Sequence, residues 1–324
     1  MQRCKLEPSD DKQAYMNLLE LLGALPRDCL AAFRSEGFKV NRNAWDILLR
    51  IQPHLVDLAV LLDRDERRGL PSINLVRGKL TKLQSLWLDV EGNTKQLYRE
   101  ISAWFQHAPA LQNLHISRLD PDLSSIWNSP VQAPLLNLQS LSLFGLDVSD
   151  SVTGIVTALR LPRLQALKII DCSNAKQLLQ LFAEGFKECS SSSLKSFIYN
   201  NYMFEDAWAA VTELFKSTKG LINVVIKDEQ GRNPPELRDL SLHADSLQEL
   251  QLTFGLKGSG CSIRDVEYLA ANCKSLERLV IRLDSLHQVV NNLAILERFD
   301  LSTSRKYSRS LVSSSEMVHI QYID

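Results

Sequence analysis

Three groups of residues have the types that carry out chemistry in enzymes: a glycine-rich segment, the histidines and two aspartates. The segment GLKGSGCS (residues 255–262) follows an expected strand and precedes an expected helix, where phosphate-binding loops belong. Such a loop needs a lysine and then Ser or Thr after its last glycine, but Gly260 is followed by Cys261 and Ser262. Because no lysine is there to meet a phosphate charge, we interpret the segment as a turn.

The other candidates also lack the spacing that chemistry requires. No HxH, HExxH or His/Cys pair at metal-binding distance occurs among the histidines at positions 54, 107, 115, 243, 287 and 319. No serine stands in GxSxG, and neither Asp245 nor Asp284 has a catalytic partner at a diagnostic interval. The six cysteines show neither CxxC nor framework spacing, which favours free, reduced thiols. We predict no catalytic residue, no metal site and no cofactor, so the chain is expected not to be an enzyme.

Composition narrows the classes of partner. The 324 residues are 45% hydrophobic and 23% charged, with 37 basic and 38 acidic side chains. This balance gives no whole-chain attraction to nucleic acid or to an anionic membrane. No apolar run approaches the ~18 residues of a membrane span, and MQRCKLEPSDDKQ lacks a signal-peptide core. We expect a cytoplasmic or nuclear protein with no nucleic-acid or membrane partner.

One apolar pattern recurs along most of the chain. In LTKLQSLWLDV, Leu83, Leu86 and Leu88 stand at offsets 0, +3 and +5. The same pattern returns at intervals of 20 to 30 residues, with a weaker copy at Leu30, whose +5 position is Ser35. The first leucines of the copies are Leu30, Leu55, Leu83, Leu111, Leu138, Leu164, Leu194, Leu221, Leu247, Leu276 and Leu296. Even spacing identifies a structural repeat.

Segments between the copies have the periodicity of amphipathic helices, namely residues 94–108, 174–186, 205–217 and 262–273. Each unit is therefore a short strand, a turn, and a helix or irregular return. Three or four buried side chains supply about 5–12 kcal/mol at ~1.5–3 kcal/mol each, whereas ordering such a unit costs about 40 kcal/mol. One unit cannot fold alone, so the units must stack. The pattern predicts an α/β protein whose strands run parallel, with positions +3 and +5 facing the core.

The recurring LxxLxL resembles the leucine-rich-repeat family in its longer class, which includes ribonuclease-inhibitor-like repeats. The resemblance implies a horseshoe-shaped solenoid with the parallel sheet on its concave face and the helices on its convex face. It places an N-terminal helical cap or truncated first repeat at residues 1–24 and about eleven repeats at 25–302. Residues 303–324 are expected to be a polar tail or a last strand. The Asn or Cys that this family carries at offset +8 occurs only as Cys172, so we expect irregular loops.

The amino-acid sequences of three segments are similar to the repeat arrays of fungal F-box proteins: LPRDCLAAFRSEGF, DILLRIQPHLVDLAV and LRDLSLHADSLQELQL. This resemblance implies a substrate receptor of a cullin-type ubiquitin ligase, in which an F-box docks an adaptor and the repeats hold the target. An F-box begins with Leu-Pro, and the only N-terminal candidate for that start is Leu25-Pro26. The first repeat leucine, Leu30, follows directly after it, so the repeat pattern occupies the place where the F-box helices would lie. We expect no F-box in these residues, and an adaptor as partner only if an F-box lies outside this chain.

The inner sheet face is the predicted binding surface. If +3 and +5 face the core, then +2, +4 and +6 project from the other face of the sheet. Large apolar side chains in those rows suit a protein-binding patch with Trp as its anchor, although scattered apolar groups on a sheet are also ordinary. The predicted apolar contacts are Trp87, Phe144, Ile170 and Ile198, and the predicted orienting residues are His115, Lys168, Arg278 and Arg282.

These observations predict a protein–protein interaction scaffold that holds a protein on its concave face. The first hypothesis is the substrate-recognition component of a cullin-type ubiquitin ligase, or a relative without the adaptor-binding module. The alternatives are a ribonuclease-inhibitor-like enzyme regulator and a leucine-rich-repeat binding module unrelated to ubiquitination. A strongly acidic face would favour an inhibitor of a basic enzyme, and the mixed charges of these rows argue against it.

Overall fold

The structure is a computed structural model, and it describes residues 2–5, 11–40, 42–63, 76–91, 101, 104–117, 137–189, 192–201, 207–228, 237–254, 268–269, 271–282, 306–310 and 317–323. The chain forms two compact units. Unit 1 comprises Met1–Leu164 and Cys172–Asn174, and unit 2 comprises Gln165–Asp171 and Ala175–Asp324.

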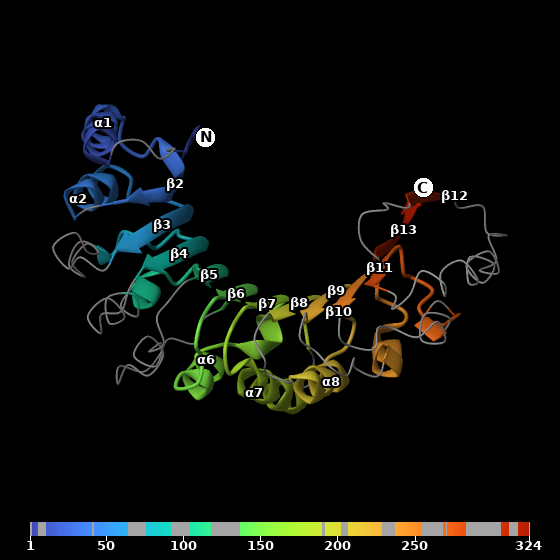
Figure 1. The fold of residues 1–324 in the computed structure, drawn as a ribbon. Helices are drawn as coiled ribbons and strands as arrows, with labels where there is room; N and C mark the ends of the chain where they lie inside the picture. The colour runs from blue at the N-terminus through green and yellow to red at the C-terminus, as the bar shows by residue number, and fades with distance from the viewer. Residues whose placement is uncertain are drawn as a thin grey trace. The chain divides into compact units, whose positions relative to one another are not determined.

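Unit 1 contains parallel strands that pair in chain order (Figure 1). Its strands are β1 (Gln2–Lys5), β2 (Leu30–Lys39), β3 (Asp57–Asp63), β4 (Ser85–Glu91), β5 (Asn113–Ser117) and β6 (Ser140–Phe144). Its helices include α1 (Asp11–Ala24), α2 (Arg42–Ile51), α6 (Val152–Thr157) and the short 3₁₀ helix η2 (Leu161–Arg163), and residues 104–107 are also helical. Helices α1 and α2 pack together on one side of the strands.

Unit 2 repeats this arrangement. Its parallel strands are β7 (Ala166–Ile170), β8 (Ser196–Asn201), β9 (Asn223–Asp228), β10 (Glu249–Phe254) and β11 (Arg278–Arg282). Its helices include α7 (Ala175–Glu188), α8 (Trp208–Ser217) and the 3₁₀ helix η3 (Leu237–His243). Within residues 303–324, β13 (Met317–Ile323) pairs antiparallel with β11, and β12 (Lys306–Ser310) pairs antiparallel with β13.

The α/β class and the parallel strands predicted from the repeat are confirmed within each unit. The +3 residues of β3 to β6 are partners in register, as are their +5 residues, and the same holds for β7 to β10. In unit 1 the residues at most 2% exposed include Leu58, Leu86, Leu114, Leu141, Val60, Leu88, Ile116 and Leu143. In unit 2 they include Leu167, Phe197, Val224, Leu250, Ile169, Tyr199, Ile226 and Leu252. Two-residue alternation therefore places every one of these side chains on the same face of its sheet.

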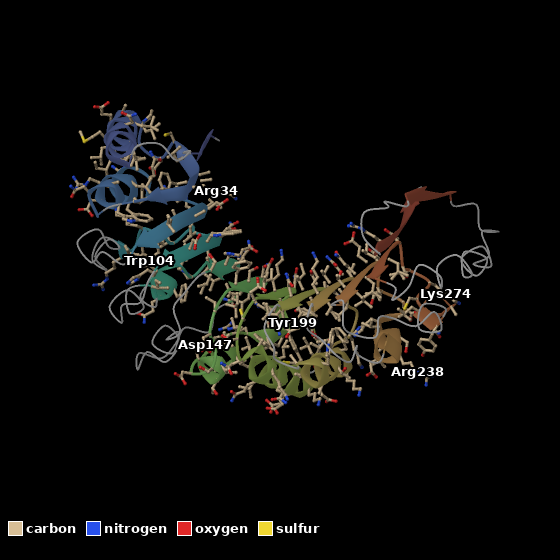
Figure 2. All side chains as sticks on the ribbon, in the orientation of Figure 1. Arg34, Trp104, Asp147, Tyr199, Arg238 and Lys274 are labelled. Atoms are coloured by element: carbon tan, nitrogen blue, oxygen red, sulfur yellow. The ribbon has the colours of Figure 1, made fainter. Side chains whose placement is uncertain are left out.

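Helices cover this apolar face in unit 2. Figure 1 shows α7 and α8 side by side, on one side of the strands. Their buried residues recur at helical spacing, as in Leu178, Phe182 and Phe186 of α7. Tyr199 lies between the strands and the helices, where it is 1% exposed (Figure 2). The helices predicted over 174–186 and 205–217 are confirmed as α7 and α8, whereas most of 262–273 lies outside the described residues.

The first strand of the array departs from the predicted register. A bulge in β2 lets Ser35 pair with Val60 and Lys39 pair with Leu61, so Lys39 takes the +6 row in place of Glu36, which stands six residues after Leu30. Ser35 takes the +5 core position and is 1% exposed. A hydroxyl in that position gives the strand less apolar area to bury than the aliphatic residues of the other copies, and the extra residues are accommodated as a bulge.

Candidate protein-binding surfaces

Unit 1 aligns the predicted outward row across its strands. Arg34 pairs with Ala59, which pairs with Trp87, and the row continues through His115 to Ser142. These are the +4 positions of successive repeats, and their side chains stand about 5 Å apart on neighbouring strands. Figure 2 shows Arg34 on the face of the sheet turned away from α1 and α2.

Trp87 is the most conspicuous side chain of this face. It is 50% exposed, although tryptophan is usually well buried in proteins. Its ring stacks on His115 with 3.5 Å between ring centroids and 22° between ring planes. The imidazole therefore covers one face of the indole, and half of the Trp87 side chain stays exposed.

Polar and charged groups surround Trp87. Arg34 donates a 2.6 Å hydrogen bond to the Asp57 carboxylate, and Asn113 donates a 3.0 Å hydrogen bond to the Ser85 hydroxyl. Phe144 lies two residues beyond Ser142 on β6 and is half-buried. We name the set Trp87, Asp89, His115, Ser142 and Phe144 the Trp87 surface.

Unit 2 aligns the corresponding row from β7 to β11. Lys168, Ile198, Val225, Gln251 and Val280 are partners in register. Two residues further along the strands, Ile170, Asn200, Lys227 and Thr253 form a second row in register. Lys168, Ile170, Ile198 and Lys227 are half-buried, as side chains packed along a sheet face should be.

Two predicted arginines lie on the last parallel strand. Arg278 is exposed, and its guanidinium is 3.9 Å from the carboxylate of Glu249 on β10. The backbone of Arg282 pairs with Met317, and its side chain lies outside the described residues. The structure thus places Trp87, His115 and Phe144 on one face in unit 1. In unit 2 it brings Lys168, Ile170 and Ile198 together on β7 and β8, and it places Arg278 on the same face but on β11, at the other end of the parallel strands.

Some side chains at outward positions are buried, which the repeat pattern did not predict. Four such residues are buried, each at most 7% exposed: Ala59 and Leu61 of β3, Ser117 of β5 and Val280 of β11. Ala59 is a short side chain between the long side chains of Arg34 and Trp87, so its neighbours cover it. The sequence rows therefore overstate the accessible area.

Sequence reasoning also missed the contribution of the +2 row. In unit 1 this row begins with Ala32 and continues in register through Asp57, Ser85, Asn113 and Ser140. It supplies the Asp57 carboxylate that accepts from Arg34, and it contains the Asn113–Ser85 hydrogen bond. Its signal was four polar residues at one repeat offset, which together with the +4 row predict a carboxylate near Arg34.

Burial and hydrogen bonds shift the pKa values of Asp147 and Cys273, two groups within the described residues. Partial burial pushes the pKa of Asp147 up, but hydrogen bonds from Ser149 and Asn174 outweigh it and hold that pKa below its ordinary value. Burial raises the pKa of the Cys273 thiol to about 11, so this thiol stays protonated at neutral pH. Across the part of the chain that the structure describes, no three His, Cys, Asp or Glu side chains are grouped to hold a metal ion. The glycine-rich segment 255–262 and Asp284 lie outside that part.

No protein-family model matches the chain, and a search of curated proteins finds no significant match. Among the described residues, no helix combines the length and the apolar character needed to cross a membrane.

Proposed function

We propose that this protein is an interaction scaffold that binds a protein partner through the outward face of its unit 1 sheet, with Trp87 as the anchor. The observation that carries the proposal is the half-exposed indole of Trp87, stacked on His115 and surrounded by polar side chains. Buried tryptophans surrounded by a polar rim dominate the affinity of many protein interfaces.

The energetics favour Trp87 as an anchor. Half of a tryptophan side chain is ~100 Å², and its removal from water stabilises a complex by ~2.5 kcal/mol at ~25 cal/mol per Å². The stack on His115 already restricts the indole, so binding costs less side-chain entropy than it would for a free rotor. Phe144 on β6 extends the apolar area along the same face.

We also propose that the fold is a leucine-rich-repeat solenoid with the parallel sheet on its concave side. It is supported by the recurrence of LxxLxL and by the register of its inward side chains in each unit. The similarity of LRDLSLHADSLQELQL and its companions to fungal F-box proteins extends the proposal to a ubiquitination substrate as the partner. The adaptor and the cullin would then join through an adaptor-binding module outside these residues.

The test compares capture of proteins from native extract by wild type, Trp87→Ala and Leu242→Ala, with quantitative mass spectrometry. Leu242 is a matched control because it is a 57% exposed aliphatic residue on η3, away from the sheet. We expect Trp87→Ala to lose at least ten-fold of the specific partner while its melting temperature stays within about 2 °C of wild type. Equal capture by Trp87→Ala would contradict the proposal.

The ubiquitin-ligase part has its own readout in the same experiment. Recovery of an adaptor and a cullin with the full-length gene product supports the receptor role. Recovery of a partner that depends on Trp87, without an adaptor or a cullin, would support a binding module and contradict the ubiquitin-ligase role.

A further inference from the structure

The outward face of unit 2 has a different chemistry from the Trp87 surface. Among its described residues on β7 to β11, the charged side chains are Lys168, Lys227, Arg278 and Glu249, three cations against one carboxylate. Glu249 faces Arg278 at 3.9 Å. Among the described residues, the side chains of Lys168 and Lys227 form no hydrogen bond or ion pair.

The register fixes the separation of these two lysines. Lys168 lies in the same row as Ile198 and Val225, and Lys227 lies two residues beyond Val225. Two strand spacings of ~4.8 Å and two residues of ~3.3 Å place the two Cα atoms ~12 Å apart. In an extended peptide, residues i and i+4 lie on one side of the chain ~13 Å apart. The two separations match.

Aliphatic side chains occupy the area between the lysines. Ile198 and Val225 lie between Lys168 and Lys227, and Ile170 borders them on β7. All three are half-buried and present part of their area to solvent. Figure 2 shows side chains projecting from this face of β7 to β10, the face turned away from α7 and α8. We name Lys168, Ile170, Ile198, Val225 and Lys227 the lysine surface.

We infer that the lysine surface binds an extended acidic segment of a protein, with carboxylates at i and i+4 and an aliphatic residue at i+2. The carboxylates pair with Lys168 and Lys227, and the aliphatic residue packs on Ile198 and Val225. This inference rests on the proposed function, since it assigns a partner class to the second of the two sheet faces.

A protein segment fits this face better than a nucleic acid does. Single strands bind where bases stack on aromatic rings, and the described outward positions of β7 to β11 carry no aromatic side chain. Glu249 would also repel a continuous phosphate backbone at the edge of the face. Alternating acidic and aliphatic side chains match both the charges and the apolar area.

The two faces would therefore select different parts of a partner. The described part of the unit 1 face carries Asp57 and Asp89 against the single guanidinium of Arg34, which is bonded to Asp57. An acidic segment gains no attraction there. Charge complementarity thus directs it to unit 2 and leaves the Trp87 surface for an apolar segment.

Fluorescence anisotropy with synthetic peptides on the full chain tests the inference. The probe is a fluorescein-labelled ten-residue Ser/Thr peptide with Glu at positions 3 and 7 and Val at position 5. We expect it to bind wild type, and Lys168→Glu/Lys227→Glu to weaken binding at least ten-fold. Salt should weaken it as well, because the contacts are partly exposed ion pairs.

Three comparisons make the test specific. Lys219→Glu/Lys274→Glu is the matched variant, because it changes the net charge by the same amount at exposed lysines outside the strands. A peptide with both glutamates adjacent tests the i, i+4 spacing, and a ten-nucleotide oligothymidine tests nucleic acid. The inference predicts that the matched variant binds like wild type and that both other probes bind at least five-fold more weakly.

The inference is overturned if the probe does not bind wild type, if the matched variant loses binding equally, or if either alternative probe binds as well. Circular dichroism checks folding, and Lys168→Gln/Lys227→Gln replaces the charge reversal if that variant does not fold. Trp87→Ala separates this inference from the proposed function. We expect this variant to lose capture of the partner from native extract and to bind the acidic peptide as wild type does. If it captured the partner but no longer bound the peptide, both the proposed function and this inference would be rejected.

Discussion

His243 is a buried histidine whose charge state affects stability. Its side chain is at the end of η3, it is 1% exposed, and its Nδ1 accepts a 3.4 Å hydrogen bond from the Leu221 N–H. Burial lowers its pKa, and the Phe215 carbonyl opposes that effect only in part. The Phe215 ring stands edge-on to the imidazole, with 6.2 Å between centroids. Native His243 is therefore neutral at pH 7.

Because the pKa of His243 is lowered in the native state, the free energy of unfolding decreases as the pH is lowered. Below its ordinary pKa of ~6.5 the unfolded chain takes up a proton that the native chain resists, so the unfolded state binds more protons. The contribution of His243 to the free energy of unfolding is fully present above that pH. It decreases as the pH falls toward the native pKa, by at most ~1.4 kcal/mol per pH unit for one group. Urea unfolding at pH 7.5, 6.5 and 5.5 measures it.

His243→Asn isolates this residue, because the asparagine oxygen can still accept from Leu221. We expect the variant to be less stable than wild type at pH 7.5 and to lose less stability by pH 5.5. Parallel stability curves for the two proteins would show that His243 is not the group responsible.

At the scale of elements, one buried amide ties the end of α2 to the start of β2. The Gln52 side chain accepts a 2.9 Å hydrogen bond from the Leu30 N–H and donates a 2.8 Å hydrogen bond to the Pro26 carbonyl. Gln52 is 1% exposed, so both backbone groups depend on it rather than on water. The turn before β2 therefore has its shape set by a side chain 22 residues further on.

Gln52→Ala should destabilise the protein by about 1–3 kcal/mol, because it leaves the buried Leu30 N–H and the Pro26 carbonyl without partners. Equilibrium unfolding in urea measures the difference. Gln139→Ala is the matched control, since Gln139 is exposed beside β6, and it should change stability by less than about 0.5 kcal/mol. A Gln52→Ala protein as stable as this control would show that the bridge is replaceable.

The sequence predicted the pairing of strands better than it predicted the surface. Strand register follows from which side chains must be buried, and Leu86 or Leu141 at +3 could face only the core. Exposure of an outward residue depends instead on its neighbours across the sheet. Ala59 is closed by the longer side chains beside it, and the stack of Trp87 on His115 joins residues 28 positions apart. The repeat register predicts that Trp87 and His115 are neighbours, but it does not predict how they stack or how much area they leave exposed.

Irregular elements were also beyond the repeat pattern. The bulge of β2 arises where the +5 position is Ser35, and the sequence marked that copy as weak without indicating how the strand would respond. The Gln52 bridge leaves no signal in the apolar pattern, because the side chain 22 residues after the first leucine is Gln52 in one copy and His243 in another, and each accepts from the N–H of that leucine. The LxxLxL repeat predicts which apolar residues are buried, and it does not predict which polar side chains bond the backbone between the strands.

At the scale of the whole molecule, each unit is built from contacts between chain neighbours. From β2 to β6 and from β7 to β10, every strand pairs with the strands just before and after it in its unit. Such quasi-one-dimensional arrays have stabilities that are sums of local and nearest-neighbour contributions. Damage to one repeat should therefore spread to its neighbours and fade with distance along the chain.

Phe197→Ala tests this locality in unit 2. Phe197 is 0% exposed on β8 and meets the Phe215 ring edge-on, with 5.9 Å between centroids, so its truncation should cost about 3–5 kcal/mol. Amide hydrogen exchange should accelerate in β7, β8, β9 and α8, and should change little in β3 and β4. Ile198→Ala, on the opposite face of the same strand, should leave exchange nearly unchanged. Equal acceleration throughout β3 to β10 would mean that the chain unfolds as one cooperative body, because a local array cannot transmit the loss of one ring across so many strands.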